Sequence, residues 1–286
     1  MIITDNFVFV HIPKTGGTFV EKILKDALRK KKILTPKQQE DRLFRWGIKR
    51  PTYQKYQAQS SIYAKAGKIK SQHNLCKDIP PKYADFDIVS NIRNPFDWYV
   101  SAYEYKYKRP DTHRFFQNHD TLPATCEKRY PNFPELSFAE SLDFLFEPFI
   151  SAQLEAMQID KKLDIGFFTL QFIKFFFKEP KKIIANFDDA YINSDSYKND
   201  MFDVHFLQQE NLNADLFNLL TKYKYEAKDI QYIQEHQRIL PHNKGRSKAQ
   251  KWEKYYTPEL LELVKHKDRF LFRLFPAYLN VLQNTL

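Results

Sequence analysis

The chain has 286 residues, a length that suits one large α/β domain or two small ones, and its formal net charge of +10 favours anionic partners. Its two cysteines have neither CxxC spacing nor a cluster of histidines beside them, which argues against a disulfide framework and against a structural zinc site. No run reaches the ~18 uninterrupted apolar residues of a membrane span, and the N-terminus lacks the basic and apolar segments of a signal peptide.

The first predicted element is an apolar strand from Phe7, which runs into a glycine turn and then a helix over Val20–Leu28. Strand, tight turn and helix N-terminus in this order form an anion site, because backbone N–H groups and the helix dipole converge there. The lysine adds a charge, the threonine hydroxyls add donors, and the glycines let the backbone approach closely. The alternative is an ordinary turn with a solvated lysine. The turn consists of Pro13, Lys14, Thr15, Gly16, Gly17, Thr18 and Phe19.

The segment from His11 to Thr18, His-Ile-Pro-Lys-Thr-Gly-Gly-Thr, resembles the 5′-phosphosulfate loop of sulfotransferases that use 3′-phosphoadenosine 5′-phosphosulfate (PAPS). It is most similar to the branch of Golgi carbohydrate sulfotransferases and their bacterial relatives. The resemblance implies a P-loop-like central parallel sheet flanked by helices, in a single domain over residues 1–286. It also implies PAPS as co-substrate, adenosine 3′,5′-bisphosphate (PAP) as product, and no metal ion.

Golgi members of that branch carry a membrane anchor. The absence of such a segment here points to a soluble bacterial protein of the cytoplasm, with peripheral attachment to a membrane as the alternative. The oligomeric state stays open.

A polar, basic region over roughly Lys30–Lys70 is expected to form loops and a helix or two above the nucleotide or acceptor site. A short strand ending at Ser71 would then bring His73 to the sheet edge that carries the glycine turn. The resemblance implies that a histidine between the 5′-phosphosulfate loop and a second nucleotide motif, which runs from Arg93 to Ser101, is the catalytic base. A structural histidine is the alternative at this position.

A second motif follows the strand predicted over Asp85–Ile92. Arg93 stands at the carboxyl end of that strand, where open α/β sheets bind ligands, and Pro95 starts a helix that carries Ser101 two turns along. Arg-Asn-Pro with a serine eight residues after the arginine resembles the 3′-phosphate motif of the same family. The alternative is an arginine paired with Asp97 and a serine bonded to its own helix.

The middle of the chain contains an aromatic and basic stretch over Tyr105–Arg129, which forms either an acceptor groove or a solvated loop. Apolar helices are predicted over Ser137–Phe149 and Leu163–Phe177, with phenylalanines at a spacing typical of core. Late strands are predicted over Ile183–Phe187 and Val204–Leu207.

The stretch Gln208–Leu216 resembles one that the family often carries, and we expect it to be mainly architectural. Within it, Asn213 is predicted to cap a helix over Ala214–Thr221, and Glu210 is a minor candidate for orienting the nucleotide or the acceptor.

A basic loop near residue 245 resembles one that closes over the nucleotide phosphates, which implies contacts from Lys244 and Arg246, although a glycine replaces the usual serine between them. A last helix is predicted from an N-cap at Thr257 to about Phe275.

Sulfuryl transfer resembles phosphoryl transfer in relying on positioning and electrostatics. Lys14 would stabilise the leaving phosphate oxygen, and His73 would take the proton of the attacking hydroxyl. The resemblance implies a carbohydrate acceptor, on a glycan or glycolipid. The alternatives are a P-loop-like kinase or NTPase, which would need Mg²⁺ and ATP, and a non-enzymatic basic domain that binds glycans or nucleic acid. No recognised nucleic-acid module is present, so we expect no nucleic-acid partner.

Overall fold

A computed structural model describes residues 1–30, 54–55, 73–106, 122–236 and 250–283. The chain divides into two compact units, and each is described by itself. The first unit comprises Met1–Arg93 and Asp203–Gly245, and the second comprises Asn94–Phe202 and Arg246–Leu286.

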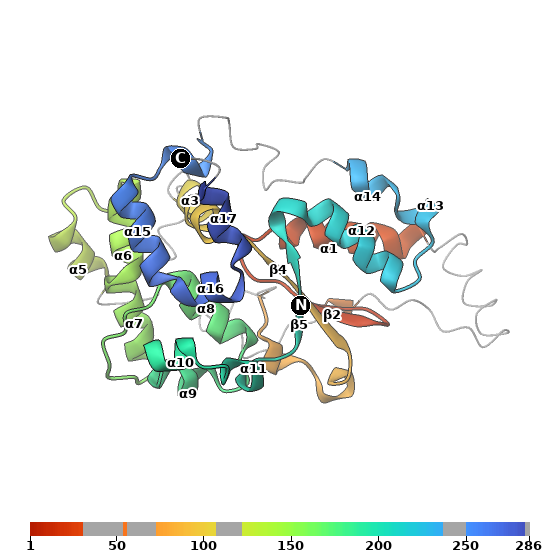
Figure 1. The fold of residues 1–286 in the computed structure, drawn as a ribbon, viewed down its shortest axis with the longest axis horizontal. Helices are drawn as coiled ribbons and strands as arrows, with labels where there is room; N and C mark the ends of the chain where they lie inside the picture. The colour runs from red at the N-terminus through yellow and green to blue at the C-terminus, as the bar shows by residue number, and fades with distance from the viewer. Residues whose placement is uncertain (31–53, 56–72, 107–121, 237–249, 284–286) are drawn as a thin grey trace. The chain divides into compact units, whose positions relative to one another are not determined.

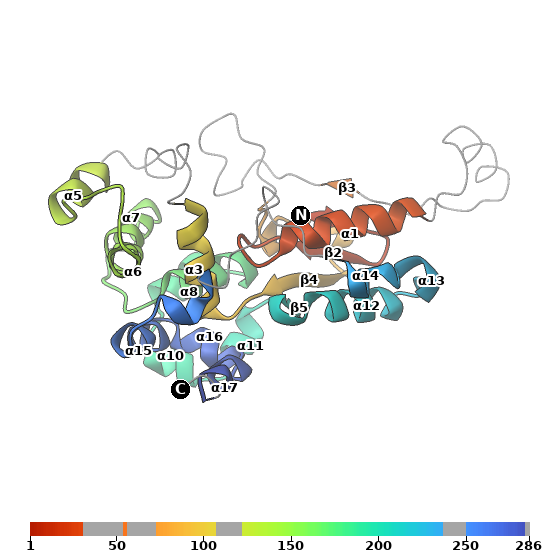
Figure 2. The same ribbon diagram turned by 90° about the horizontal axis from the view of Figure 1, so that it is seen from above.

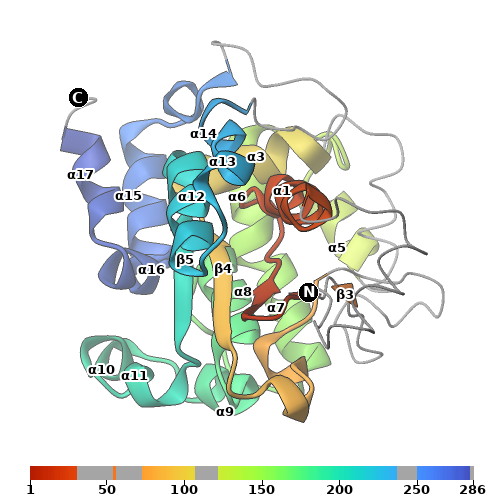
Figure 3. The same ribbon diagram turned by 90° about the vertical axis from the view of Figure 1, so that its right-hand side faces the viewer.

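The first unit is built on a five-stranded sheet in the order β3-β1-β2-β4-β5. Strands β2 (Phe7–Val10), β4 (Asp87–Ile92) and β5 (Val204–Gln208) are parallel, and Figure 3 shows β4 and β5 side by side. Strand β1 (Ile2–Ile3) is antiparallel to both β2 and β3 (Gln54–Lys55). The predicted parallel sheet is therefore confirmed in its central strands.

Helices α1 (Gly17–Lys30) and α12 (Leu212–Lys222) pack beside each other on the sheet (Figure 1). They bury the face that carries Phe7 and Phe9 of β2 and Val89 of β4. The shorter elements of this unit are the 3₁₀ turns η1 (Cys76–Asp78), η2 (Pro81–Tyr83) and η4 (Gln209–Asn211) and the helices α13 (Ala227–Ile230) and α14 (Tyr232–Glu235).

The second unit is helical in its described residues. Helix α8 (Phe167–Phe176) is buried along its whole length, which confirms the predicted phenylalanine core. Figure 2 shows α6 and α7 as neighbours. The other elements are α3 (Pro95–Lys106), α5 (Leu122–Arg129), α6 (Phe138–Phe146), α7 (Pro148–Ala156), α9 (Pro180–Ala185), α10 (Asp189–Asn193), α11 (Tyr197–Asp200), η7 (Trp252–Lys254), α15 (Pro258–Lys267), α16 (Arg269–Leu274) and α17 (Ala277–Gln283).

Two predictions of secondary structure are wrong for identifiable reasons. The strand predicted over Ile183–Phe187 is helix α9 for most of its length. Pro180 takes the first position of this helix, and the β-branched pair Ile183 and Ile184 lies within the helical turn that follows it. The helix predicted over Ser137–Phe149 is two helices, because Pro148 begins a new one.

The predicted cap at Asn213 is also wrong. Helix α12 begins two residues earlier than predicted, at Leu212, with Asn211 at the N-cap position. The side-chain amide of Asn213 instead donates to the carbonyls of Ile233 and His236, at 2.7 and 2.9 Å. Asn213 therefore fastens α12 to α14. Thr257, by contrast, is confirmed as the cap of α15, since its hydroxyl accepts from the N–H of Leu260.

The last predicted helix is interrupted at Asp268, whose carboxylate is fully buried. Its Oδ2 accepts from the Tyr99 hydroxyl at 2.6 Å, and its Oδ1 accepts from the N–H and hydroxyl of Thr169 at 2.9 and 2.7 Å. Burial raises the pKa of Asp268 to about 6 against its ordinary 3.8, although these hydrogen bonds oppose the shift. Protonation of Asp268 therefore favours folding, and that contribution is lost as the pH rises through about 6.

The variant Asp268→Ala is expected to lower the free energy of unfolding by about 3 kcal/mol, because the buried donors of Tyr99 and Thr169 lose their acceptor. Asp268→Asn should cost less, since an amide oxygen can still accept from Thr169. Urea unfolding followed by circular dichroism measures both, with the exposed Asp160→Ala as matched control. An Asp268→Ala protein as stable as that control would contradict this role.

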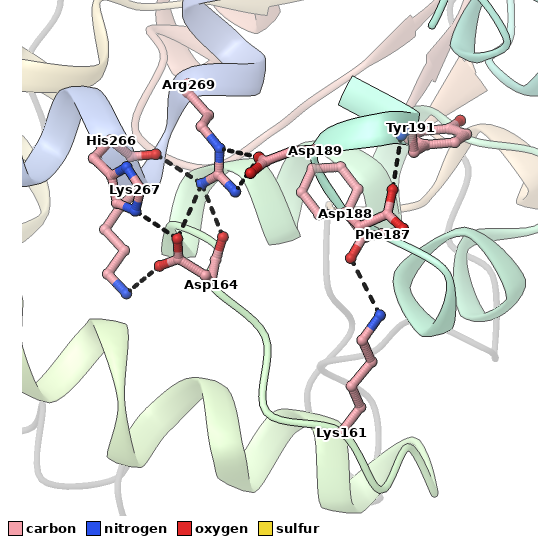
Figure 4. A network of polar contacts seen from close by, with 9 residues as sticks. All are labelled: Lys161, Asp164, Phe187, Asp188, Asp189, Tyr191, His266, Lys267 and Arg269. Carbon is pink, nitrogen blue, oxygen red and sulfur yellow. Dashed lines mark hydrogen bonds and ion pairs between the residues drawn. The ribbon is translucent and has the colours of Figure 1, made fainter. Parts of the chain in front are cut away.

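A network of polar contacts joins the segment before α8 to the corner between α15 and α16 (Figure 4). Asp164 forms ion pairs with Lys267 and Arg269 and a hydrogen bond with His266, and Arg269 also binds Asp189 at the start of α10 at 2.7 Å. These side chains are at least partly exposed, so each pair contributes about 0–1 kcal/mol at most. Their effect is to fix the local arrangement of three segments of the second unit.

Candidate active site

The turn between β2 and α1 has the backbone geometry of an anion nest. Lys14 and Gly16 have positive φ angles of 69° and 94°, and Thr15 between them does not. Alternating handedness of this kind turns successive N–H groups toward one point. Gly16 is required here for its φ and for space, because a Cβ would lie 2.8 Å from Cδ2 of Leu212.

Side chains at the carboxyl end of β4 hold the carbonyls of this turn. Asn91 Nδ2 donates to the Thr15 carbonyl at 3.1 Å, and Arg93 Nη1 donates to the Lys14 carbonyl at 2.9 Å. In a trans peptide the carbonyl and the following N–H point in opposite directions. The N–H groups of Thr15 and Gly16 therefore face away from the groups that hold the carbonyls, and add to the unpaired N–H groups at the start of α1.

Two loop residues differ from expectation. The hydroxyl of Thr15 is fully buried and donates to the Ile12 carbonyl at 2.9 Å, so Thr15 offers an anion its backbone N–H and not its hydroxyl. Phe19 lies in the core, and its N–H donates to the Gly16 carbonyl at 2.9 Å. Pro13 and Lys14 are half-buried and Thr18 is exposed. The side chains of Lys14 and Thr18 thus remain the candidates within the turn.

Two histidines meet beside the turn. The ring centroids of His11 and His73 are 4.7 Å apart, and Nδ1 of His73 lies 2.9 Å from the His11 carbonyl oxygen. The ring of His11 covers Gly17 so closely that a Cβ there would lie 2.1 Å from Cδ2 of His11. The structure thus brings His73 to the predicted loop. His11, which sequence reasoning assigned no role, connects the two, and its place in the loop motif was the available signal.

The hydrogen bond to His11 determines which nitrogen of His73 is basic. A carbonyl oxygen can only accept, so Nδ1 carries the hydrogen and Nε2 is the basic nitrogen of the neutral ring. Burial lowers the pKa of His73 below its ordinary 6.5, and the hydrogen bond offsets this in part. His73 is therefore neutral at physiological pH, as a general base must be.

The second motif, from Arg93 to Ser101, is positioned by the end of β4 and the start of α3. Arg93 follows β4 directly and is 7% exposed. Asn94 starts α3, because its Oδ1 accepts from the N–H of Phe96 at 3.0 Å, and Pro95 takes the first helical position, as predicted. Ser101 lies in α3, half-exposed, in the second unit.

The segment after β5 packs against the turn at Gly16. Leu212 and Gln209 both lie against Gly16, and the carboxylate of Asp215 accepts from the N–H of Gln208 at 2.7 Å. These contacts agree with an architectural role for Gln208–Leu216. Glu210 is exposed.

Some predicted positions lie outside the described residues: Lys244, Arg246, the strand ending at Ser71, most of Lys30–Lys70, and residues 107–121. Within the described part of the chain, no group of three or more His, Cys, Asp or Glu side chains is placed to hold a metal ion. Among the helices described, none has both the length and the apolar character needed to cross a bilayer.

Comparison with known proteins yields one match. The sequence model of a family described as "Sulfotransferase family" matches residues 1–278, a span that includes the turn, both histidines, Arg93 and Ser101. No curated protein and no solved structure matches the chain significantly.

Proposed function

Because the chain belongs to the sulfotransferase family, and is accordingly a transferase, we propose that it moves a sulfuryl group from PAPS to a hydroxyl of a carbohydrate acceptor. The observation that carries the proposal is the anion nest of residues 14–16 with Lys14 on it and His73 beside it. A nest offers fixed N–H donors to an oxyanion, and a neutral histidine offers a base.

The donor would be held at its two ends. The backbone N–H groups of the turn, together with Lys14 and Thr18, would bind the 5′-phosphosulfate. The close packing at Gly16 and Gly17 supports the shape of this turn, because a Cβ at Gly16 would lie 2.8 Å from Leu212 and a Cβ at Gly17 would lie 2.1 Å from the ring of His11. Arg93 and Ser101 would bind the 3′-phosphate, to which a planar guanidinium fork is well suited. Lys244 and Arg246 are further proposed contacts.

The reaction would be a direct displacement at sulfur. The acceptor hydroxyl oxygen forms a bond to sulfur, the bond from sulfur to the 5′-phosphate oxygen breaks, and the hydroxyl proton passes to Nε2 of His73. Lys14 stabilises the charge that develops on the leaving phosphate oxygen. The products are a sulfate ester and PAP. The lowered pKa of His73 supports its role as the base.

The choice of a glycan or glycolipid acceptor rests on family resemblance. The proposal also takes the chain as a single catalytic domain that works in the cytoplasm. A screen of acceptors with isotopically labelled PAPS, read by mass spectrometry, identifies the hydroxyl that is sulfated.

Calorimetry tests the nucleotide proposal directly. We expect PAP to bind more tightly than ATP, whether or not Mg²⁺ is present, because the proposed site would have phosphate ligands for both ends of PAP. Tighter binding of ATP in the presence of Mg²⁺ would favour a kinase or NTPase. Salt-sensitive binding to heparin without any nucleotide binding would favour a non-enzymatic glycan-binding domain.

A further inference from the structure

Asn91 is a fully buried amide at the carboxyl end of β4, immediately behind the anion nest. Its Nδ2 donates to the Thr15 carbonyl at 3.1 Å. Its Oδ1 is also buried and has no partner among the described residues. A buried polar atom without a partner costs free energy, so this side chain is not what stability alone would select.

The orientation of the Asn91 amide follows from its partner. The Thr15 carbonyl can only accept, so the NH₂ group must face it and the oxygen must face the other way. Flipping the amide would set two acceptors against each other. The unpartnered oxygen is thus the consequence of holding the Thr15 carbonyl.

Holding that carbonyl sets the direction of one donor of the nest. The carbonyl of Thr15 and the N–H of Gly16 belong to the same peptide, so they point in opposite directions. When Asn91 binds the carbonyl, the Gly16 N–H points to the anion side. Nδ2 of Asn91 is also 3.5 Å from where a Cβ of Gly16 would lie, so the amide packs against this peptide.

We propose that Asn91 is a positioning residue that gives the site its selectivity for ligands with a 5′-anionic group. This inference rests on the proposed function, because it takes the nest to be the site of the 5′-phosphosulfate. Asn91 does not touch the nucleotide. It acts through the Thr15–Gly16 peptide, whose N–H it keeps aimed at the 5′-group.

The experiment compares two ligands that differ only at the 5′ end. Calorimetry gives the dissociation constants of PAP and of adenosine 3′-monophosphate for the wild type and for Asn91→Leu, a substitution of similar volume. We expect Asn91→Leu to raise the dissociation constant of PAP about tenfold or more and to leave the dissociation constant of adenosine 3′-monophosphate unchanged. We also expect a melting temperature within about 3 °C of the wild type, since the unpartnered oxygen is removed together with the hydrogen bond.

Two further variants keep the test decisive. Asn91→Asp preserves the size of the side chain, but a carboxylate cannot donate to the Thr15 carbonyl and brings a negative charge behind the nest. The affinity for PAP should therefore fall by about 100-fold. Asn213→Leu removes another side-chain amide that donates to backbone carbonyls in the same unit, and should leave the ratio of the two dissociation constants unchanged.

The outcomes separate this inference from the proposed function. One outcome is that the wild type prefers PAP, but Asn91→Leu and Asn91→Asp keep the wild-type ratio of the two dissociation constants, including the case in which both affinities fall equally. In that case the role of Asn91 is overturned and the proposed function stands. If the wild type itself does not prefer PAP to adenosine 3′-monophosphate, the 5′-site is absent and both fall.

Discussion

Replacing Lys14 by alanine is expected to slow sulfuryl transfer by about 100- to 1,000-fold, the loss typical of removing one group that stabilises a developing oxyanion. Lys14 is the only charged residue of the turn from Pro13 to Phe19. A single turnover at saturating PAPS isolates the chemical step, and calorimetry with PAP measures binding separately. The rate should fall more than the affinity, because the charge on the leaving oxygen is greatest in the transition state.

The backbone at Lys14 calls for a second variant. Its φ of 69° lies in the left-handed region, which a non-glycine residue adopts at a cost of about 1 kcal/mol or more. Lys14→Gly removes the amino group and relieves that strain. If the charge is what matters, Lys14→Gly should be as slow as Lys14→Ala.

The control for charge is Lys22→Ala, which removes an exposed lysine from α1 and should leave the rate unchanged. Turnover like that of the wild type in Lys14→Ala, or full recovery in Lys14→Gly, would contradict the assignment of Lys14 to the leaving group.

Replacing His73 by asparagine is expected to slow transfer by about 100- to 10,000-fold, the range for loss of a general base, while PAP binding persists. Asparagine can keep a donor near the position of Nδ1, and so the hydrogen bond to the His11 carbonyl, but it has no counterpart to Nε2. His73→Ala loses both. Similar rates for the two variants would assign the effect to proton transfer and not to the hydrogen bond.

The pH dependence gives an independent reading of His73. In the wild type, kcat/KM should fall as the pH drops through the pKa of His73, which lies below 6.5, because protonation removes the base. His73→Asn should lack that acid limb, and the exposed His205→Asn should keep it. A wild-type rate, or an unchanged acid limb, in His73→Asn would exclude His73 as the base and make Glu210 the next candidate.

Much of the first unit could be predicted because its signals are local. A continuous apolar run predicts a strand buried on both faces, and β2 is such a strand. Asparagine followed by proline predicts a helix start, which is how α3 begins after Arg93. The strand predicted at Ile183–Phe187 failed because a short β-branched pair fits a buried helix turn equally well.

The sequence by itself determined the strand, the glycine turn and the helix, since each depends on the conformational preferences of neighbouring residues. It determined the arginine motif for the same reason. Only the tertiary structure decided which atoms of the turn face an anion. That depends on Asn91 and Arg93, which bind carbonyls 76 and 79 residues away in the chain. It also decided the tautomer of His73, through a carbonyl 62 residues away. Donor directions follow from long-range hydrogen bonds, which no local pattern encodes.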